Sequence, residues 1–378
     1  MPPLGLLIKP ASSNCNLSCK YCFYHSITEN RRIKSYGMMS LKTLEILVRK
    51  ALLYAEYSCT FVFQGGEPTL VGLDFYKVLI ELENKFNIKK LKIFNAIQTN
   101  GIVIDDKWAE FLADKKFLVG LSLDGPGDIH DINRIDANNK GSFQKIMNTV
   151  NLFNKYHVEF NILFVVNSVV VRHSDKIYKF FKKHKFNYLQ FIPCLDPINK
   201  KPGDQEYSLK PDAYASFLKN LFNLWYEDLM KGNRISIRYF DNIIGMVMGY
   251  KPEACGILGV CQSQLIIEAD GGVYPCDFYV IDDWHLGNIK EVELDELKNS
   301  DKSKRFIEMS KFIDPQCKAC KWFNLCRGGC RRNREPFKDE NQVLNYYCSS
   351  YREFFEAASE RINNFPYMTR RSKILSSN

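Results

Sequence analysis

The fold is decided by the stretch Cys15-Asn-Leu-Ser-Cys19-Lys-Tyr-Cys22, in which three thiols follow an apolar, strand-like segment at residues 4–8. A structural zinc site takes four ligands and disulfides take cysteines in pairs, so three thiols fit neither. A cubane iron–sulfur cluster held by three thiolates leaves one iron free to bind another molecule. We therefore predict such a cluster here, with a partial zinc site completed by a remote ligand as the alternative.

Length and composition narrow the class of protein. The 378 residues exceed the usual size of one domain, which predicts a large domain with a smaller one. A hydrophobic content of 46% and a charged content of 25% are typical of a soluble globular protein. The formal net charge of +9 would suit a nucleic-acid-binding protein, but the basic residues are dispersed and anionic clusters would cancel part of the charge. We expect no nucleic-acid partner.

The cysteine content is linked to the expected compartment. No run of about 18 apolar residues could span a membrane, and the first residues are not typical of a signal peptide. We therefore expect a cytoplasmic protein without a membrane partner. Disulfides are rare in that compartment, so metal binding is the better explanation of thirteen cysteines.

Strand-like apolar runs alternate with amphipathic helical patterns in the first half of the chain. Six such runs occur, at residues 4–8, 60–63, 91–97, 117–123, 158–166 and 188–192. Eight strand–helix units close a full barrel, so six predict an α/β fold with a partial (β/α)6 TIM-type barrel that is open on one side. Chemistry in such folds gathers at the carboxyl ends of the strands, which here carry the cysteine loop and the polar turns at 64–68, 98–101 and 124–126.

The alternation stops near residue 235, where cysteines become dense. We place a domain boundary there, with the barrel at 1–234 and a cysteine-rich domain at 235–378 that ends in a helix and a polar tail at 369–378.

The second domain contains most of the remaining thiols. An Asp270-Gly271 hairpin delivers Cys276, which Asp277 follows directly. Cys59 and Cys194 lie in or at the end of predicted strands and are interpreted as buried core residues. The other eight thiols could hold two zinc ions, but iron–sulfur clusters can exchange electrons with the first cluster and zinc cannot. Eleven cysteines then divide as three, four and four; the later eight are Cys255, Cys261, Cys276, Cys317, Cys320, Cys326, Cys330 and Cys348.

These motifs resemble a known family. The C-x3-C-x2-C loop with Tyr21, together with Gly65-Gly66-Glu67, is similar to the radical S-adenosylmethionine superfamily, and the later cysteines resemble its SPASM domain, which carries two auxiliary iron–sulfur clusters. Over residues 3–355 the chain most resembles the anaerobic sulfatase-maturating enzymes, in the motifs Lys9-Pro-Ala-Ser-Ser, Phe63-Gln-Gly-Gly-Glu-Pro-Thr, Gln98-Thr-Asn-Gly, Leu123-Asp-Gly-Pro, Tyr274-Pro-Cys-Asp-Phe-Tyr-Val and Asn345-Tyr-Tyr-Cys.

The resemblance implies three 4Fe–4S clusters and S-adenosylmethionine as a co-substrate. By this resemblance, the reactive cluster is held by Cys15, Cys19 and Cys22. One auxiliary cluster is held by Cys255, Cys261, Cys276 and Cys330, and the other by Cys317, Cys320, Cys326 and Cys348. The implied contacts of S-adenosylmethionine are Tyr21, Gly65, Gly66, Glu67, Ser122, Arg134 and Leu195.

The resemblance also implies a reaction. A Cys or Ser in a Cys/Ser-x-Pro-x-Arg segment of an unfolded or nascent sulfatase would be oxidised to Cα-formylglycine (3-oxoalanine). A 5′-deoxyadenosyl radical would remove a hydrogen from Cβ, an auxiliary cluster would take the second electron, and Asp277 would be the base. Without the resemblance, Asp277 would be interpreted as a turn cap. Tyr24 and Gln64 adjoin the cofactor motifs and are candidate substrate contacts or packing residues. A flavodoxin or ferredoxin would supply low-potential electrons.

Three other functions are compatible with parts of the pattern. Another SPASM peptide-modifying enzyme, such as one that forms thioether cross-links, would share every cluster motif. A zinc-bearing binding module would contain zinc without iron and sulfide. A simple electron-transfer ferredoxin would have no need of the barrel.

Overall fold

The computed structural model describes residues 3–198, 200–335 and 344–375, with the backbone alone from residue 366 onward. The chain forms two compact units. The first comprises Met1–Leu123, Gly127–Leu163 and Gln262–Met309, and the second comprises Asp124–Pro126, Phe164–Cys261 and Ser310–Asn378. Among the described residues, no helix combines the length and apolar character that crossing a membrane requires. The boundary at residue 234 is a division along the sequence and stays a prediction.

A mixed sheet forms the centre of the first unit. Its parallel part consists of β1 (Leu4–Ile8), β2 (Ser58–Phe63), β3 (Lys92–Thr99), β4 (Leu118–Ser122) and the first half of β5 (Phe160–Val166). On the other edge of β1 lie β8 (Ile266–Ile267), which is parallel to β1, and the antiparallel strands β9 (Gly272–Tyr274) and β10 (Gly287–Asn288). The hairpin that precedes Cys276 is thereby joined to the strand that precedes the cysteine loop.

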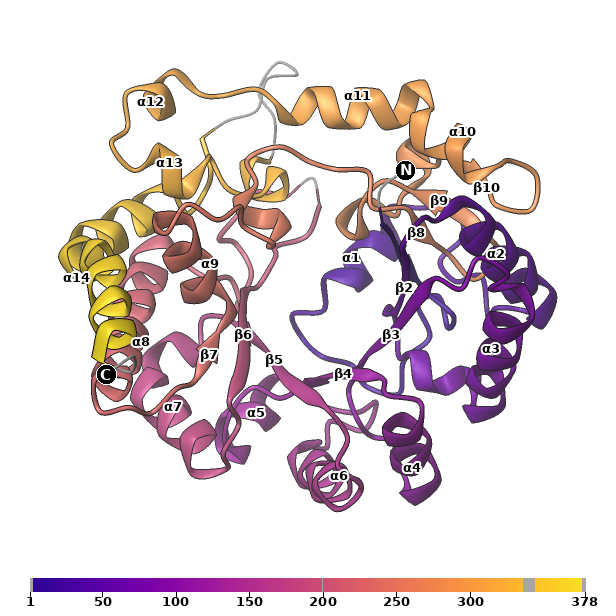
Figure 1. Cartoon of the computed structure of the whole chain (residues 1–378), viewed down its shortest axis with the longest axis horizontal. Helices are drawn as coiled ribbons and strands as arrows, with labels where there is room; N and C mark the ends of the chain where they lie inside the picture. Colours follow the sequence, from indigo (N-terminus) through magenta and orange to yellow (C-terminus); the bar gives the residue numbers. More distant parts are fainter. Residues whose placement is uncertain (1–2, 199, 336–343, 376–378) are drawn as a thin grey trace. The chain divides into compact units, whose positions relative to one another are not determined.

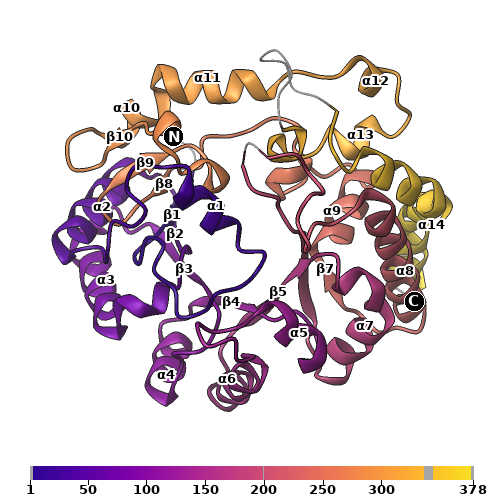
Figure 2. The same ribbon diagram turned by 180° about the vertical axis from the view of Figure 1, so that it is seen from behind.

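Helices cover this sheet. In Figures 1 and 2, α2 and α3 lie on one side of strands β1–β3 and α1 lies on the other. Helix α2 starts after Ser40, whose side chain accepts a hydrogen bond from Thr43 N as expected for an N-cap, and its inward-facing residues Leu44 and Leu47 are buried. The helices of this unit are α1 (Phe23–Glu29), α2 (Leu41–Tyr54), α3 (Leu73–Phe86), α4 (Asp106–Asp114), α5 (Gly127–Asn133), α6 (Phe143–Tyr156), α10 (Leu294–Asn299) and, but for its last residue, α11 (Asp301–Ser310).

The second unit contains the end of β5, then β6 (Tyr188–Pro193) and β7 (Ser236–Ile237), in that order across its sheet. Its longest helices pack through aromatic rings, and the rings of Phe222 in α8 and Phe354 in α14 meet edge to face at 5.6 Å. The helices of this unit are α7 (Ser174–Lys183), α8 (Pro211–Met230), α9 (Arg238–Val247), α12 (Pro315–Lys318), α13 (Phe323–Cys326) and α14 (Cys348–Leu375).

The six predicted strands all occur, each within a few residues of its predicted bounds. In the described residues β10 pairs only with β9 and β7 only with β6, so the sheet does not close. Sequence reasoning missed the short strand β7 beside β6. It predicted the hairpin strand that became β8, but not the pairing of that strand with β1. Helix α14 continues to Leu375, into the predicted polar tail at 369–378; residues 376–378 lie outside the described part of the chain.

A buried carboxyl group on α3 makes stability depend on pH. Glu83 is 5% exposed, and its only described polar partner is Asn95, whose side-chain nitrogen donates to Oε2 at 3.1 Å. Desolvation raises the pKa of Glu83 from 4.5 to about 7. Ionisation therefore opposes folding as pH rises from 4.5 towards 7, by about 3 kcal/mol in full.

We expect Glu83→Gln to stabilise the protein above pH 7 by up to about 3 kcal/mol and to have little effect near pH 4.5. Anaerobic urea unfolding at several pH values measures this difference. Glu81→Gln, at an exposed position of the same helix, is the control. An equal gain at both ends of the pH range would contradict the account of Glu83.

Candidate active site

The three thiols of the first loop lie at the carboxyl end of β1. Cys22 is the N-cap of α1; burial raises the pKa of its thiol, and the nearby backbone N–H groups of Tyr24 and His25 oppose the rise. Desolvation raises the pKa of the Cys15 thiol to about 12, with smaller contributions from the charges of Glu67, Cys19 and Cys22. The three sulfurs are thus close enough to interact electrostatically, as ligands of one cluster must be.

The Gly65-Gly66 turn after β2 packs against this loop. Both glycines have positive φ, +116° and +53°, in a region that favours glycine. A Cβ on Gly66 would lie 2.2 Å from the carbonyl oxygen of Asn14, one residue before the first ligand. A Cβ on Gly65 would lie 2.7 Å from Cγ of Lys9. The turn needs glycine because the cysteine loop and Lys9 pass so closely.

Glu67 joins this turn to the next one. It is 1% exposed; its Oε1 accepts from the backbone N–H and hydroxyl of Thr69 and from the hydroxyl of Thr99, and its Oε2 accepts from Asn100 N at 2.7 Å. Burial raises the pKa of Glu67, while these donors oppose the rise. The side chain predicted as a cofactor contact therefore holds together the turns that follow β2 and β3. The side chain of Asn100 in turn reaches Cys15 Sγ at 3.7 Å.

The other predicted cofactor contacts fall into two groups. In the first unit, Arg134 lies over the ring of Tyr21, with Cζ 5.5 Å from the ring centroid, and Lys20 N donates to the carbonyl of Asn133 at 3.0 Å. Ser122, at the end of β4, accepts a hydrogen bond from Gln98 Nε2 at 3.1 Å. Tyr21 and Arg134 are therefore brought together beside the cysteine loop. The remaining predicted contact, Leu195, belongs to the second unit.

Asp277 is 7% exposed and follows Cys276 on the hairpin that is joined to β1. Lys9 Nζ donates to its Oδ1, and Gln64 Nε2 donates to its Oδ2 at 3.0 Å. Lys9 Nζ also lies 4.2 Å from the centroid of the Tyr24 ring. The structure thus brings the predicted base together with Gln64 directly, and with Tyr24 through Lys9. Sequence reasoning missed Lys9, although its position at the carboxyl end of a buried strand was a signal.

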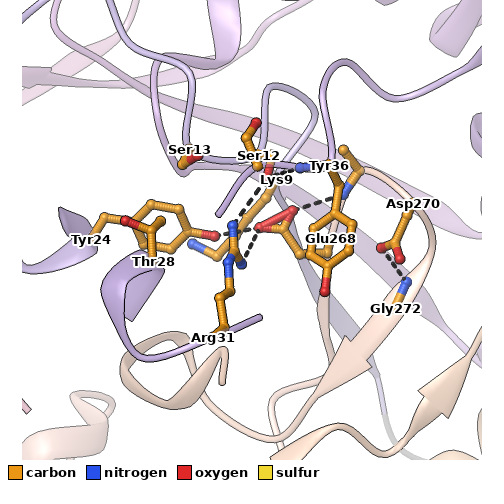
Figure 3. Close-up of polar contacts among 12 residues, drawn as sticks. Lys9, Ser12, Ser13, Tyr24, Thr28, Arg31, Tyr36, Glu268, Asp270 and Gly272 are labelled. Carbon is orange, nitrogen blue, oxygen red and sulfur yellow. Dashed lines mark hydrogen bonds and ion pairs between the residues drawn. The ribbon is translucent and has the colours of Figure 1, made fainter. Parts of the chain in front are cut away.

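A buried polar network fixes Tyr24 (Figure 3). Its hydroxyl donates to Glu268 Oε1, which also accepts from Arg31 Nη1 at 3.1 Å. Arg31 Nη2 donates to Ser12 Oγ at 3.2 Å, within the loop that leads to Cys15. Burial, followed by the charge of Glu268, raises the pKa of Tyr24 well above 10. Arg31 and Glu268 were not predicted, although an acid directly after the apolar strand β8 could have indicated a buried partner.

Three of the four thiols predicted for the first auxiliary cluster meet in the second unit. Desolvation raises the pKa of Cys330 to about 12, and the charges of Cys261 and Cys255 also raise it. The backbone N–H of Cys261 is held by Ser310 Oγ at 2.8 Å. The fourth predicted ligand, Cys276, belongs to the first unit.

The four thiols of the second predicted auxiliary cluster line one cavity. This cavity of about 280 Å³ lies in the second unit, where α12 carries one of these thiols, α13 ends at another and α14 begins at a third. Trp322, Phe323, Tyr351 and Phe355 supply aromatic walls. A cavity surrounded by four sulfurs and apolar rings fits a buried cluster; its thiols are Cys317, Cys320, Cys326 and Cys348.

In the described part of the chain, no three His, Cys, Asp or Glu side chains are grouped to hold a single metal ion. Cys59 and Cys194 are buried, as predicted for core residues.

Comparisons with known proteins agree with this site. Residues 10–181 match the model of the radical SAM superfamily, and residues 255–321 match the SPASM model, an iron–sulfur cluster-binding domain. The chain is therefore a radical S-adenosylmethionine enzyme with an iron–sulfur SPASM domain, and the predicted fold class is confirmed.

Comparison with individual relatives identifies the family within the radical SAM superfamily. The cysteine-type anaerobic sulfatase-maturating enzyme of Clostridium perfringens is 54% identical over 364 residues, which cover 96% of this chain and 98% of the relative. The serine-type enzyme of Bacteroides thetaiotaomicron is 31% identical over 383 residues, covering 97% and 90%. This chain belongs to the family of anaerobic sulfatase-maturating enzymes. The solved structure of native anSMEcpe with bound AdoMet and Cp18Cys peptide matches with a TM-score of 0.93 and 53% identity, covering 96% of this chain and 99% of that one.

Proposed function

We propose that this enzyme oxidises a cysteine in a Cys-x-Pro-x-Arg segment of a sulfatase to Cα-formylglycine. The observation that carries the proposal is the placement of Asp277, a buried carboxylate joined through Lys9 and Gln64 to the turn that packs on the cysteine loop. A base is thereby held beside the loop that would hold the reactive cluster. The higher identity to a cysteine-type than to a serine-type relative, 54% against 31%, supports cysteine as the substrate residue.

The reaction requires three species to leave the substrate. Conversion of CH2–SH to a thioaldehyde removes one hydrogen atom, one proton and one electron, and water then replaces sulfur to give the aldehyde and hydrogen sulfide. When bound, the reactive cluster and S-adenosylmethionine would supply the radical chemistry that removes the hydrogen atom from Cβ. Asp277 would accept the thiol proton at the lone pairs that Lys9 and Gln64 leave free. Burial of the surrounding side chains limits the access of water to this step.

The ligand sets follow from the thiol groupings. Cys15, Cys19 and Cys22 would hold the reactive cluster, and the cavity in the second unit would hold an auxiliary cluster on Cys317, Cys320, Cys326 and Cys348. A second auxiliary cluster would be held by Cys255, Cys261, Cys276 and Cys330. Such clusters are suited to accept the substrate electron.

Contacts with S-adenosylmethionine would come from side chains and backbone of several turns. The turn offers the backbone of Gly65 and Gly66, and Glu67 Oε2 accepts from one described donor, Asn100 N. The set that we propose is Tyr21, Gly65, Gly66, Glu67, Ser122, Arg134 and Leu195.

The proposal also covers the state of the substrate, the electron donor and the compartment. The substrate is an unfolded or nascent sulfatase polypeptide, because a buried site must receive an extended segment. A low-potential donor such as a flavodoxin or ferredoxin supplies electrons in the cytoplasm. The catalytic module spans residues 1–234 and the SPASM module residues 235–378.

Incubation with a Cys-x-Pro-x-Arg peptide tests this function. The protein is purified and reconstituted without oxygen, then given S-adenosylmethionine and a chemical reductant. We expect a mass change that matches replacement of CH2–SH by CHO, and reaction of the product with an aldehyde reagent. Loss of two hydrogens with retention of sulfur would instead identify a thioether-forming enzyme. The same peptide with Ala in place of Cys is the control.

A further inference from the structure

Lys9 is a fully buried cation at the carboxyl end of β1, with an exposed fraction of 0%. Burying an ammonium group is costly unless it is paired and hydrogen-bonded. Here its partner is Asp277, 268 positions away in the sequence. Neither the cluster motifs nor the proposed mechanism accounts for a lysine at this position.

Two neighbours, the Tyr24 ring and Gly65, confine the Lys9 side chain. The Tyr24 ring lies 4.2 Å from Nζ, which favours a cation–π contact. A Cβ on Gly65 would come within 2.8 Å of Nζ, so this glycine leaves the space that the ammonium needs. The side chain therefore has little freedom to move away from Asp277.

The Tyr24 ring is itself immobilised. Its hydroxyl is bound by Glu268, which is 0% exposed and paired with Arg31 (Figure 3). The backbone supports the same geometry, because Lys9 N donates to the carbonyl of Ile267 at 2.8 Å, next to Glu268. Phe278, which follows Asp277, meets Phe23 of α1 edge to face at 5.1 Å. Contacts on the Lys9 side and contacts on the Asp277 side thus both hold this ion pair in place.

We propose that Lys9 is a positioning residue for aldehyde formation, which holds the Asp277 carboxylate in the orientation that receives the substrate proton. This inference rests on the proposed function. Lys9 and Gln64 each donate to one carboxylate oxygen, so the plane of the carboxylate is determined by two donors from different strands. Removal of the ammonium leaves one donor and allows the carboxylate to rotate. A small misplacement of a reacting group can lower a rate by about 100-fold.

The test separates cofactor cleavage from aldehyde formation. Wild type, Lys9→Met, Asp277→Asn and the double variant are compared by counting 5′-deoxyadenosine and aldehyde with the Cys-x-Pro-x-Arg peptide. We expect Lys9→Met to form 5′-deoxyadenosine within about 2-fold of wild type while aldehyde falls about 100-fold. In the Asp277→Asn background, Lys9→Met should cause no further fall, because it acts through the carboxylate that is already lost.

Two further variants make the outcome decisive. Lys9→Gln keeps a hydrogen-bond donor without charge and should show the same separation with a smaller fall. Lys50→Met is the control, since Lys50 is also buried but binds Val292 O at 3.0 Å and Glu293 at 2.8 Å. A parallel fall of both products in Lys9→Met, or effects that multiply in the double variant, would overturn the positioning role. If wild-type protein cleaves S-adenosylmethionine but forms no aldehyde, the proposed function itself fails, and this result is distinct from any effect of the Lys9 variants.

Discussion

Replacement of Asp277 by Asn is expected to lower aldehyde formation by about 10²- to 10⁴-fold while S-adenosylmethionine cleavage continues. The amide has nearly the same shape, but it cannot accept the thiol proton. Loss of a positioned base typically lowers a rate by about 10²- to 10⁴-fold. The cysteine loop and its Gly65-Gly66 turn do not depend on this carboxylate, so 5′-deoxyadenosine should still form. Liquid chromatography of the nucleoside and mass spectrometry of the peptide measure the two products in one reaction.

The matched control for Asp277 is an acid in the same segment between β9 and β10. Asp283 is exposed, and Asp283→Asn should leave both products at wild-type levels. Asp277→Asn with wild-type aldehyde yield would remove Asp277 from the mechanism. Loss of iron from this variant would instead assign Asp277 to the support of the adjacent ligand Cys276.

Removal of one thiol from the first loop is expected to lower S-adenosylmethionine cleavage far more than Asp277→Asn does. Cys19→Ala leaves two thiols, which cannot hold a cubane in the way that three do. We expect no detectable 5′-deoxyadenosine and a loss of about one third of the iron, since one of three four-iron clusters is gone. Iron and sulfide analysis of the reconstituted protein gives the stoichiometry.

The chain offers its own control for this experiment. Cys59 is buried within β2 and is not among the eleven proposed ligands, so Cys59→Ala should retain all of the iron and the cofactor cleavage. Equal iron in Cys19→Ala and wild type would contradict the first ligand set. A fall of iron in Cys59→Ala beyond any loss of folded protein would contradict the division of thirteen cysteines into eleven ligands and two core residues.

Much of the barrel could be predicted because its strands are buried and its helices are amphipathic. The apolar run that became β2 and the capped start of α2 at Ser40 are local features, which the sequence displays directly. Strand β7 contains two residues, too few for a periodic pattern, and β8 was predicted only as one strand of the Asp270-Gly271 hairpin. Their pairing with β6 and β1 depends on tertiary packing.

The candidate site was predicted where its chemistry follows a spacing, and missed where it depends on distant contacts. Cysteine spacing identifies ligands because thiols on one loop must reach one cluster. The pairing of Lys9 with Asp277 joins opposite ends of the chain and has no local signal. Glu67 was predicted from its motif as a cofactor contact, which stays a prediction; its four protein donors show in addition a structural role that spacing cannot reveal.

The central claim is that this enzyme removes a hydrogen atom from Cβ of a substrate cysteine and leaves an aldehyde. A Cys-x-Pro-x-Arg peptide with deuterium at Cβ of its cysteine tests both parts in one reaction. We expect one deuterium in 5′-deoxyadenosine for each aldehyde formed. 5′-Deoxyadenosine that contains no deuterium, or a deuterium-labelled nucleoside with a peptide that has kept its sulfur, would contradict the account.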